Sequence, residues 1–159
     1  MTAPILYEYW RSSASYRVRI ALNLLGEVYE ARPVNLLTAA HREADYLDLN
    51  PQGILPTLVI DGQTLTQSLA IIEYLHNTRD GSTLIPDNPL EQALVRQLSY
   101  AVAMEIHPVC NLGVAKHVVE LTNGGDAERV AWMQHFIGKG LEGLEGLLSQ
   151  GGAGMFCHG

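Results

Sequence analysis

The chain has 159 residues, of which 47% are apolar and 17% charged, a composition typical of a globular protein. Ten basic and seventeen acidic residues give a net charge of −7 without a basic cluster, which argues against nucleic-acid binding. No apolar run is long enough to cross a membrane, and the N-terminal segment lacks the pattern of a signal peptide. Two cysteines, Cys110 and Cys157, exclude a disulfide framework and a four-cysteine zinc site. We therefore expect a cytoplasmic protein with no membrane or nucleic-acid partner.

Strand and helix patterns follow one another along the first half of the chain in the order βαβαββα. The expected strands are 5–10, 29–36, 57–60 and 63–66, and the expected helices are 12–25, 42–49 and 69–76. Gly26 follows the first helix where a C-terminal glycine belongs, and Asp61-Gly62 predicts a tight hairpin turn. Strands joined by a helical crossover are expected to be parallel. Residues 1–78 are therefore predicted to form an α/β domain of the thioredoxin type.

Turn-forming residues over 79–88 predict a linker, after which the strand patterns end. Residues 89–159 are predicted to be helical, with a first helix over 90–121 kinked at Pro108 and a second after the turn at 123–126. The end of the second helix, residues 140–146, contains three glycines, each of which should cost about 0.5–1 kcal/mol relative to alanine. Because two long helices make a poor domain by themselves, we expect the helical domain to be incomplete in this chain.

Three serines stand at the junction between the first strand and the first helix, among them Ser12 and Ser13. The first turn of a helix presents N–H groups and a partial positive charge, which stabilise an anion and make a thiol easier to ionise. Position alone favours the simpler interpretation that Ser12 or Ser13 caps the helix. A nucleophilic serine is disfavoured because the Gly-x-Ser-x-Gly pattern is missing from the sequence.

Two further segments place polar or backbone groups where a ligand could bind. Leu55-Pro56 directly precedes a strand, and a cis bond there would leave the backbone of Leu55 able to pair with a ligand, although local statistics favour trans. Gln67 and Ser68 directly precede an apolar helix, where they could hold a carboxylate or merely cap the helix.

Residues of the helical half and two arginines are less informative by themselves. His107 and Cys110 have the spacing of a metal pair, but two ligands without a third are weak, and no metal is predicted. A lone helical histidine is more often structural or solvated. Arg17 and Arg19 are interpreted as structural or solvated charges on the first helix.

Residues 11–22 read Arg-Ser-Ser-Ala-Ser-Tyr-Arg-Val-Arg-Ile-Ala-Leu and resemble the signature of zeta-class glutathione transferases, the class that includes maleylacetoacetate and maleylpyruvate isomerases. The resemblance continues in order through the segments 50–52, 55–58, 67–75, 105–108 and Asn111. It implies a thioredoxin-like domain followed by the all-helical glutathione-transferase domain, usually in a homodimer. Family members continue beyond the C-terminus of this chain, so we expect a truncated form.

The resemblance also implies glutathione as the cofactor and assigns it a set of contacts. They are Ser12, Ser13, Ala14, His41, Leu55, Gln67, Ser68, Glu105, His107 and Asn111. Ser12 and Ser13 are expected to face the sulfur and to be catalytic. Gln67 and Ser68 should hold the γ-glutamyl carboxylate.

The remaining contacts follow from the same resemblance. His41 should reach the glycyl end of glutathione, and Pro56 should be cis so that Leu55 pairs with the cysteinyl part. Arg11 and His107 are candidates to hold a carboxylate or an enolate oxygen of the substrate.

The leading functional hypothesis is glutathione-dependent cis–trans isomerisation of maleylacetoacetate to fumarylacetoacetate, in aromatic amino-acid catabolism. Isomerisation of maleylpyruvate and general zeta-class transferase activity are close alternatives. A distant alternative is a non-catalytic module that binds glutathione. The sequence departs from some family members at Ala14, where they carry a cysteine.

Overall fold

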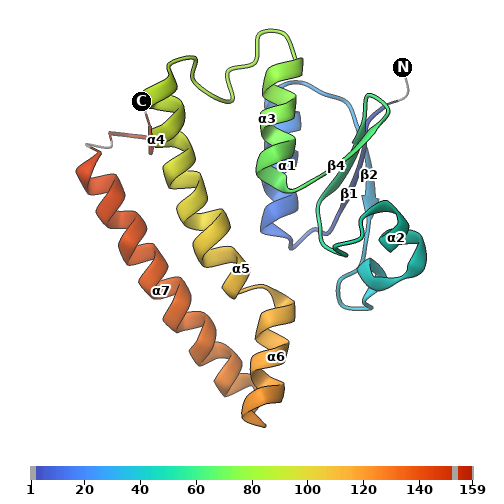
Figure 1. Ribbon diagram of the computed structural model, residues 1–159, viewed down its shortest axis with the longest axis vertical. Helices are drawn as coiled ribbons and strands as arrows, with labels where there is room; N and C mark the ends of the chain where they lie inside the picture. The colour runs from blue at the N-terminus through green and yellow to red at the C-terminus, as the bar shows by residue number, and fades with distance from the viewer. Residues whose placement is uncertain (1–2, 152–153, 159) are drawn as a thin grey trace. The chain divides into compact units, whose positions relative to one another are not determined.

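The computed structural model describes residues 3–151 and 154–158. The chain divides into two units, Met1–Ile85 and Pro86–Gly159, and each is described by itself. The first combines a sheet with helices, and the second is helical (Figure 1). Within the described part of the chain, no helix has the length and apolar character needed to cross a bilayer.

A four-stranded mixed sheet forms the centre of the first unit. Its strands are β1 (Ile5–Glu8), β2 (Glu30–Pro33), β3 (Thr57–Ile60) and β4 (Gln63–Thr66), in the order β2-β1-β3-β4. β1 runs parallel to β2 and antiparallel to β3, which pairs antiparallel with β4. The predicted parallel pair and the predicted hairpin are therefore both confirmed, as is the thioredoxin-like fold.

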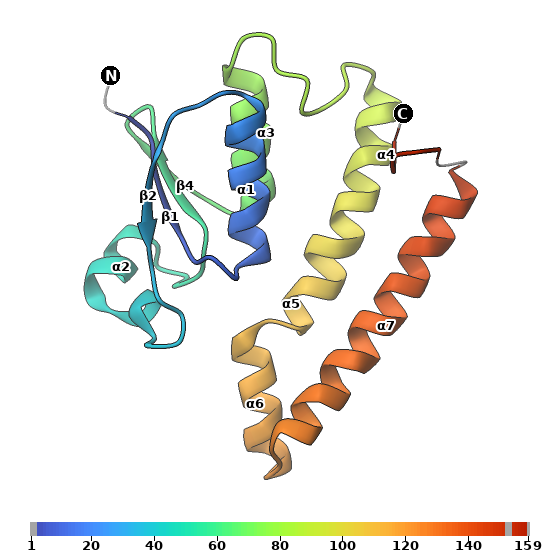
Figure 2. The ribbon, with the colours of Figure 1, turned by 180° about the vertical axis from the view of Figure 1, so that it is seen from behind.

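The helices of the first unit cover both faces of this sheet. They are α1 (Ser13–Leu24), α2 (Ala44–Leu49), which follows the short 3-10 helix η1 (Ala40–Arg42), and α3 (Ser68–Thr78). α1 and α3 lie side by side on one face, with α2 on the other (Figure 2). Because successive strand residues point to opposite faces, Leu6 is buried under α1 and α3 whereas Tyr7 packs on the α2 side.

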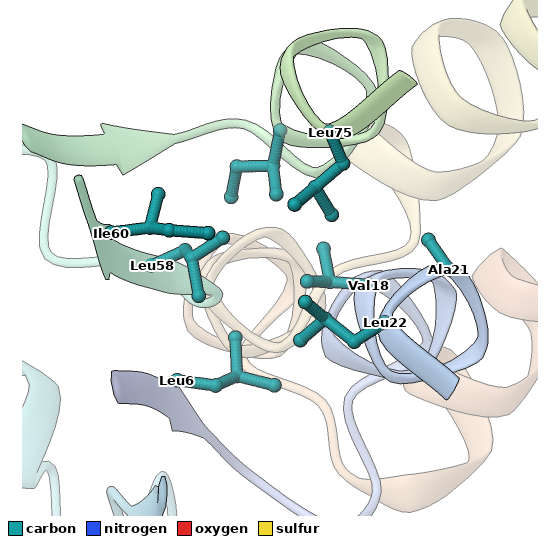
Figure 3. Close-up of a cluster of buried hydrophobic side chains, with 8 residues drawn as sticks. Leu6, Val18, Ala21, Leu22, Leu58, Ile60 and Leu75 are labelled. Atoms are coloured by element: carbon teal, nitrogen blue, oxygen red, sulfur yellow. The ribbon is translucent and has the colours of Figure 1, made fainter. Parts of the chain in front are cut away.

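The main core lies between the sheet and the pair α1 and α3. Eight buried residues form it, and they are Leu6, Val18, Ala21, Leu22, Leu58, Ile60, Ile71 and Leu75 (Figure 3). Val18, Ala21 and Leu22 repeat at the spacing of one helix face. This apolar face is thus the surface that fixes α1 on the sheet, and with it the position of the helix N-terminus.

Local turn chemistry explains the hairpin and the end of α1. Asp61 and Gly62 have φ of 52° and 74°, as a two-residue hairpin turn with both central residues left-handed requires. Gly26 has φ of 67° directly after α1, in the conformation of a C-terminal glycine. The second strand is shorter than predicted, Glu30–Pro33 rather than 29–36. All four of its residues are exposed at the sheet edge, and Pro33 has no N–H to extend the pairing.

The prediction of one kinked helix over 90–121 is wrong, because the second unit has two successive helical stretches there. α4 (Pro89–Tyr100) continues into η2 (Ala101–Ile106), a π-helical segment, and α5 (His107–Val109), after which the helix ends. Pro108 has no N–H to donate within the helix, and the wider π-helical turns directly precede it. A new helix, α6 (Leu112–Thr122), then begins, and α7 (Asp126–Gln150) follows it.

α7 approaches η2 closely at a glycine. A Cβ added at Gly140 would lie less than 3 Å from two side-chain carbons of Ile106, which is 8% exposed. A Cβ at Gly143, one turn further along α7, would meet nothing within 4 Å. Trp132 also joins α7 to α5, since its Nε1 donates to the carbonyl of Val109 at 2.8 Å. The glycine at position 140 therefore permits the contact between the helices, whereas Gly143 only weakens α7.

These two glycines give a matched pair of stability predictions. Gly140→Ala is expected to lower the free energy of unfolding by about 1–3 kcal/mol, because the new methyl group overpacks against Ile106. Gly143→Ala is expected to raise it by about 0.5–1 kcal/mol, since alanine costs less backbone entropy in a helix. Urea denaturation of both variants measures the difference. Equal stabilisation by both substitutions would contradict the close approach.

Candidate functional site

The N-terminus of α1 follows the predicted pattern. Ser12 has extended backbone angles, and its Oγ accepts a hydrogen bond from the Ser15 N–H at 3.1 Å, so Ser12 is the N-cap. The cap uses the oxygen as an acceptor, and the hydroxyl hydrogen can still be donated to another group. Ser12 and Ala14 are half-buried, whereas Ser13 is exposed in the first turn. Ser12 can therefore cap the helix and also donate its hydroxyl hydrogen to a ligand. The donation to a ligand remains a prediction.

Arg17 connects α1 to the start of α3. It lies four residues after Ser13, on the same helix face. Its Nη1 donates to Ser68 Oγ at 2.7 Å, and burial lowers the pKa of the Arg17 guanidinium. The interpretation of Arg17 as one more structural or solvated charge missed this contact. No local pattern indicates this contact, because the identity of the partner depends on how α1 packs on α3.

Gln67, directly before α3, has an unusual backbone. Its φ of 68° and ψ of 107° lie outside the regions that non-glycine residues favour. Such conformations persist where the surrounding structure fixes them, and they are concentrated at ligand sites. The Gln67 side chain contacts Gln52, whose Oε1 accepts from Gln67 Nε2 at 3.0 Å. Gln52 was not among the predicted contacts, and it forms a hydrogen bond with one of them.

The loop that carries Leu55 is held by a buried polar network. The Leu55–Pro56 bond is cis, as the family resemblance implied and local statistics did not. Asn50, which is 1% exposed, donates from Nδ2 to the carbonyl of Ile54 at 2.9 Å and to Thr57 Oγ1 at 3.2 Å. Its Oδ1 accepts from the Gln52 N–H at 3.1 Å. One amide side chain thus connects both ends of the loop.

Tyr46 on α2 also belongs to this network. Its hydroxyl donates to the carbonyl of Ile54 at 2.7 Å and lies 2.9 Å from Thr57 Oγ1. Burial raises the pKa of Tyr46, so the hydroxyl keeps its hydrogen at neutral pH. Leu55, 9% exposed, packs with Tyr46 in the smaller core on this face of the sheet. The network fixes the backbone on either side of Leu55.

His41 lies against the same loop. The φ of Gly53 is +58°, and a Cβ added there would lie 2.9 Å from the carbonyl oxygen of His41, so the two segments touch. Nδ1 of His41 is buried, and no described residue forms a hydrogen bond with it. Burial, and secondarily the charge of Arg42, lower the pKa of His41 from its ordinary value of 6.5. The imidazole is therefore mostly neutral at pH 7 in the free protein.

The other predicted site residues stay predictions in their roles. Arg11 is exposed, and its guanidinium lies 5.6 Å from the centre of the Trp10 ring. Glu105 lies exposed in η2, and His107 begins α5. Asn111 caps α6, because its Oδ1 accepts from the Val114 N–H at 2.9 Å, and its Nδ2 donates to the carbonyl of Pro108. Within residues 3–151 and 154–158, no three His, Cys, Asp or Glu side chains gather as metal ligands.

The chain is similar in sequence and in fold to several known proteins. A profile for the glutathione S-transferase N-terminal domain matches residues 11–78. The chain is 60% identical over 155 residues to the maleylacetoacetate isomerase of Rhizobium meliloti (strain 1021), covering 98% of this chain and 73% of that protein. It is 44% identical to the maleylacetoacetate isomerase of Mus musculus, of which it covers 70%.

Solved structures give the same result. The maleylacetoacetate isomerase of Methylobacterium extorquens AM1, crystallised with bound malonate and glutathione, superposes with a TM-score of 0.93 at 39% identity. That match covers 98% of this chain and 73% of the solved one. A bacterial zeta-class maleyl pyruvate isomerase in its holo form gives a TM-score of 0.92 at 35% identity, over 98% of this chain and 74% of that one.

Proposed function

Because the chain belongs to the maleylacetoacetate isomerase family of zeta-class glutathione transferases, we propose that it converts maleylacetoacetate to fumarylacetoacetate with glutathione. The observation that carries the proposal is 60% identity to a maleylacetoacetate isomerase over almost the whole chain. In the first unit, the segments that the resemblance assigned to glutathione have folded into two helix N-termini and a loop held by buried polar groups.

The donor set of the first unit fits a peptide with a thiol and two carboxylates. Ser12 and Ser13 start α1, where N–H groups and hydroxyl hydrogens favour a thiolate. Ser68 starts α3 with the Arg17 guanidinium beside it, a pairing suited to a carboxylate. The backbone of Leu55 would pair with the cysteinyl part, and His41 would reach the glycyl carboxylate. Ala14 adjoins the sulfur position without a side-chain donor.

Bound glutathione supplies the thiolate that adds to the cis double bond and leaves again after rotation about the carbon–carbon bond. Hydrogen bonds from Ser12 and Ser13, together with the positive end of α1, lower the pKa of that thiol. Arg11 and His107 would hold the carboxylate and the enolate oxygen of the substrate, where negative charge develops. Assembly into a homodimer and a cytoplasmic location complete the proposal.

The test is isomerisation of maleylacetone by this 159-residue chain, with and without glutathione. Glutathione-dependent turnover is expected. Glutathione binding without turnover on maleylacetone, maleylpyruvate or dichloroacetate would instead support the non-catalytic module. The fit to a holo maleyl pyruvate isomerase favours maleylpyruvate as the second candidate substrate. A higher kcat/KM for maleylpyruvate than for maleylacetone would select that activity.

His41 gives a prediction about pH. A bound glycyl carboxylate favours the imidazolium form, so the affinity for S-methylglutathione should rise as pH falls from 8 towards 5, by about threefold to tenfold. The S-methyl group removes the titration of the thiol. The stability of the free protein depends on pH in the opposite direction. The lowered pKa of His41 contributes stability above the unfolded pKa, and this contribution is lost as pH falls through the folded pKa. Isothermal titration calorimetry between pH 8 and pH 5 measures this affinity. For His41→Gln the affinity should not change with pH. An affinity of the unmodified chain that does not change with pH would contradict the contact between His41 and the glycyl carboxylate.

A further inference from the structure

Arg17 joins the two helices whose N-termini carry the proposed glutathione contacts. Its Nη1 lies 2.7 Å from Ser68 Oγ although the residues are 51 positions apart. Ser68 is 6% exposed and Arg17 is half-buried, so their hydrogen bond is partly shielded from solvent. We infer that Arg17 is a positioning residue for the γ-glutamyl carboxylate of glutathione and that it acts through Ser68. The inference rests on the proposed function.

The direction of this hydrogen bond is fixed by chemistry. A guanidinium has five N–H donors and no acceptor, so Ser68 Oγ must accept. The one hydroxyl hydrogen of Ser68 is then directed away from Arg17 and towards a different acceptor. A carboxylate at the N-terminus of α3 is such an acceptor, next to the N–H groups of the first turn. Arg17 thereby makes Ser68 a donor to the ligand.

Charge adds to this orientation. The N-terminus of a helix carries a partial positive charge, so a cation placed beside it is unfavourable by itself and becomes favourable when an anion binds there. Arg17 is placed in this way against α3, in surroundings that reduce the screening of its charge by water. A ligand with an ionised γ-glutamyl carboxylate should therefore be preferred over the same ligand with an uncharged carboxamide.

Arg19, two residues further along α1, shows that this arrangement is specific to Arg17. Its Nε lies 3.1 Å from Glu8 Oε2, and its guanidinium stacks 5.1 Å from the centre of the Tyr16 ring. Residues two apart on a helix point in different directions. The two arginines of the same motif thus have different partners, Ser68 on α3 and Glu8 on β1.

The experiment compares two ligands by calorimetry, S-methylglutathione and its analogue with the γ-glutamyl carboxylate converted to a carboxamide. The unmodified chain is expected to prefer the carboxylate form by about tenfold or more. Arg17→Met is expected to reduce that preference to about twofold or less and to raise KM for glutathione with kcat little changed. Arg17→Gln, which keeps an N–H donor for Ser68 but removes the charge, should lose part of the preference and serves as the test if Arg17→Met does not fold. Arg32→Met, which removes an exposed cation of β2, is the matched control and should keep the full preference.

Each outcome decides the inference. A purely structural role for Arg17 would weaken both ligands equally and leave their ratio unchanged, which would overturn it. Equal loss of preference in Arg17→Met and Arg32→Met would also overturn it, because a general charge effect would then explain the data. Failure of the unmodified chain to bind either ligand would overturn the proposed function itself, and the inference with it. Loss of preference in the Arg17 variants alone supports it.

Discussion

Ser13→Ala is expected to lower kcat for maleylacetone isomerisation by about 10²-fold, with glutathione affinity reduced by about threefold or less. The hydroxyl is proposed to donate to the thiolate, and its loss raises the pKa of the bound thiol. The acidic limb of the pH–rate profile should therefore move to higher pH. Because Ser12 and not Ser13 caps α1, this substitution leaves the helix cap intact.

Ser12→Ala should lower turnover similarly but also lower stability by about 1 kcal/mol, because Ser12 Oγ accepts the Ser15 N–H. Ser15→Ala is the matched control in the same turn of α1. The Ser15 side chain is completely buried, and its hydroxyl oxygen has no hydrogen-bond partner in the described part of the chain, so turnover should be unchanged. Unchanged turnover in both Ser12→Ala and Ser13→Ala would eliminate the thiolate role.

Asn50→Ala is expected to lower the free energy of unfolding by about 2–3 kcal/mol. The substitution removes two donors and one acceptor from a buried site, leaving the Gln52 N–H without its partner. It should also weaken glutathione binding, because Gln52 and Leu55 lose the network that fixes their backbone. Urea denaturation and calorimetry with S-methylglutathione measure the two effects.

Tyr46→Phe is expected to lower the free energy of unfolding less than Asn50→Ala does. It removes one hydroxyl from the same network but leaves Asn50 to donate to Ile54 and Thr57, so the expected loss is about 1 kcal/mol. Similar losses for Asn50→Ala and Tyr46→Phe would show that Asn50 is not the central member of the network. A large stability loss without any change in binding would show that the network stabilises the fold but does not position the site.

Features whose partners lie a few residues apart could be predicted from the sequence. The Ser12 cap and the Asp61-Gly62 turn depend on local spacing, and the parallel pairing of β1 with β2 follows from the general rule for strands joined by a helical crossover. The cis bond at Pro56 is different, because local statistics favoured trans and only the family resemblance implied cis. The helix break near Asn111 was missed, since the sequence marks Pro108 but not how far its effect extends.

The sequence by itself therefore determined the order of elements, the turns and caps, the family and the candidate glutathione contacts of this protein. Only the tertiary structure decided which side chains support those contacts. Arg17 reaches Ser68 because α1 packs against α3 on one face of the sheet, and Gln52 reaches Gln67 because two loops meet. Such pairs leave no periodic signal, because their distance along the chain is set by the intervening elements and their contact is set by packing.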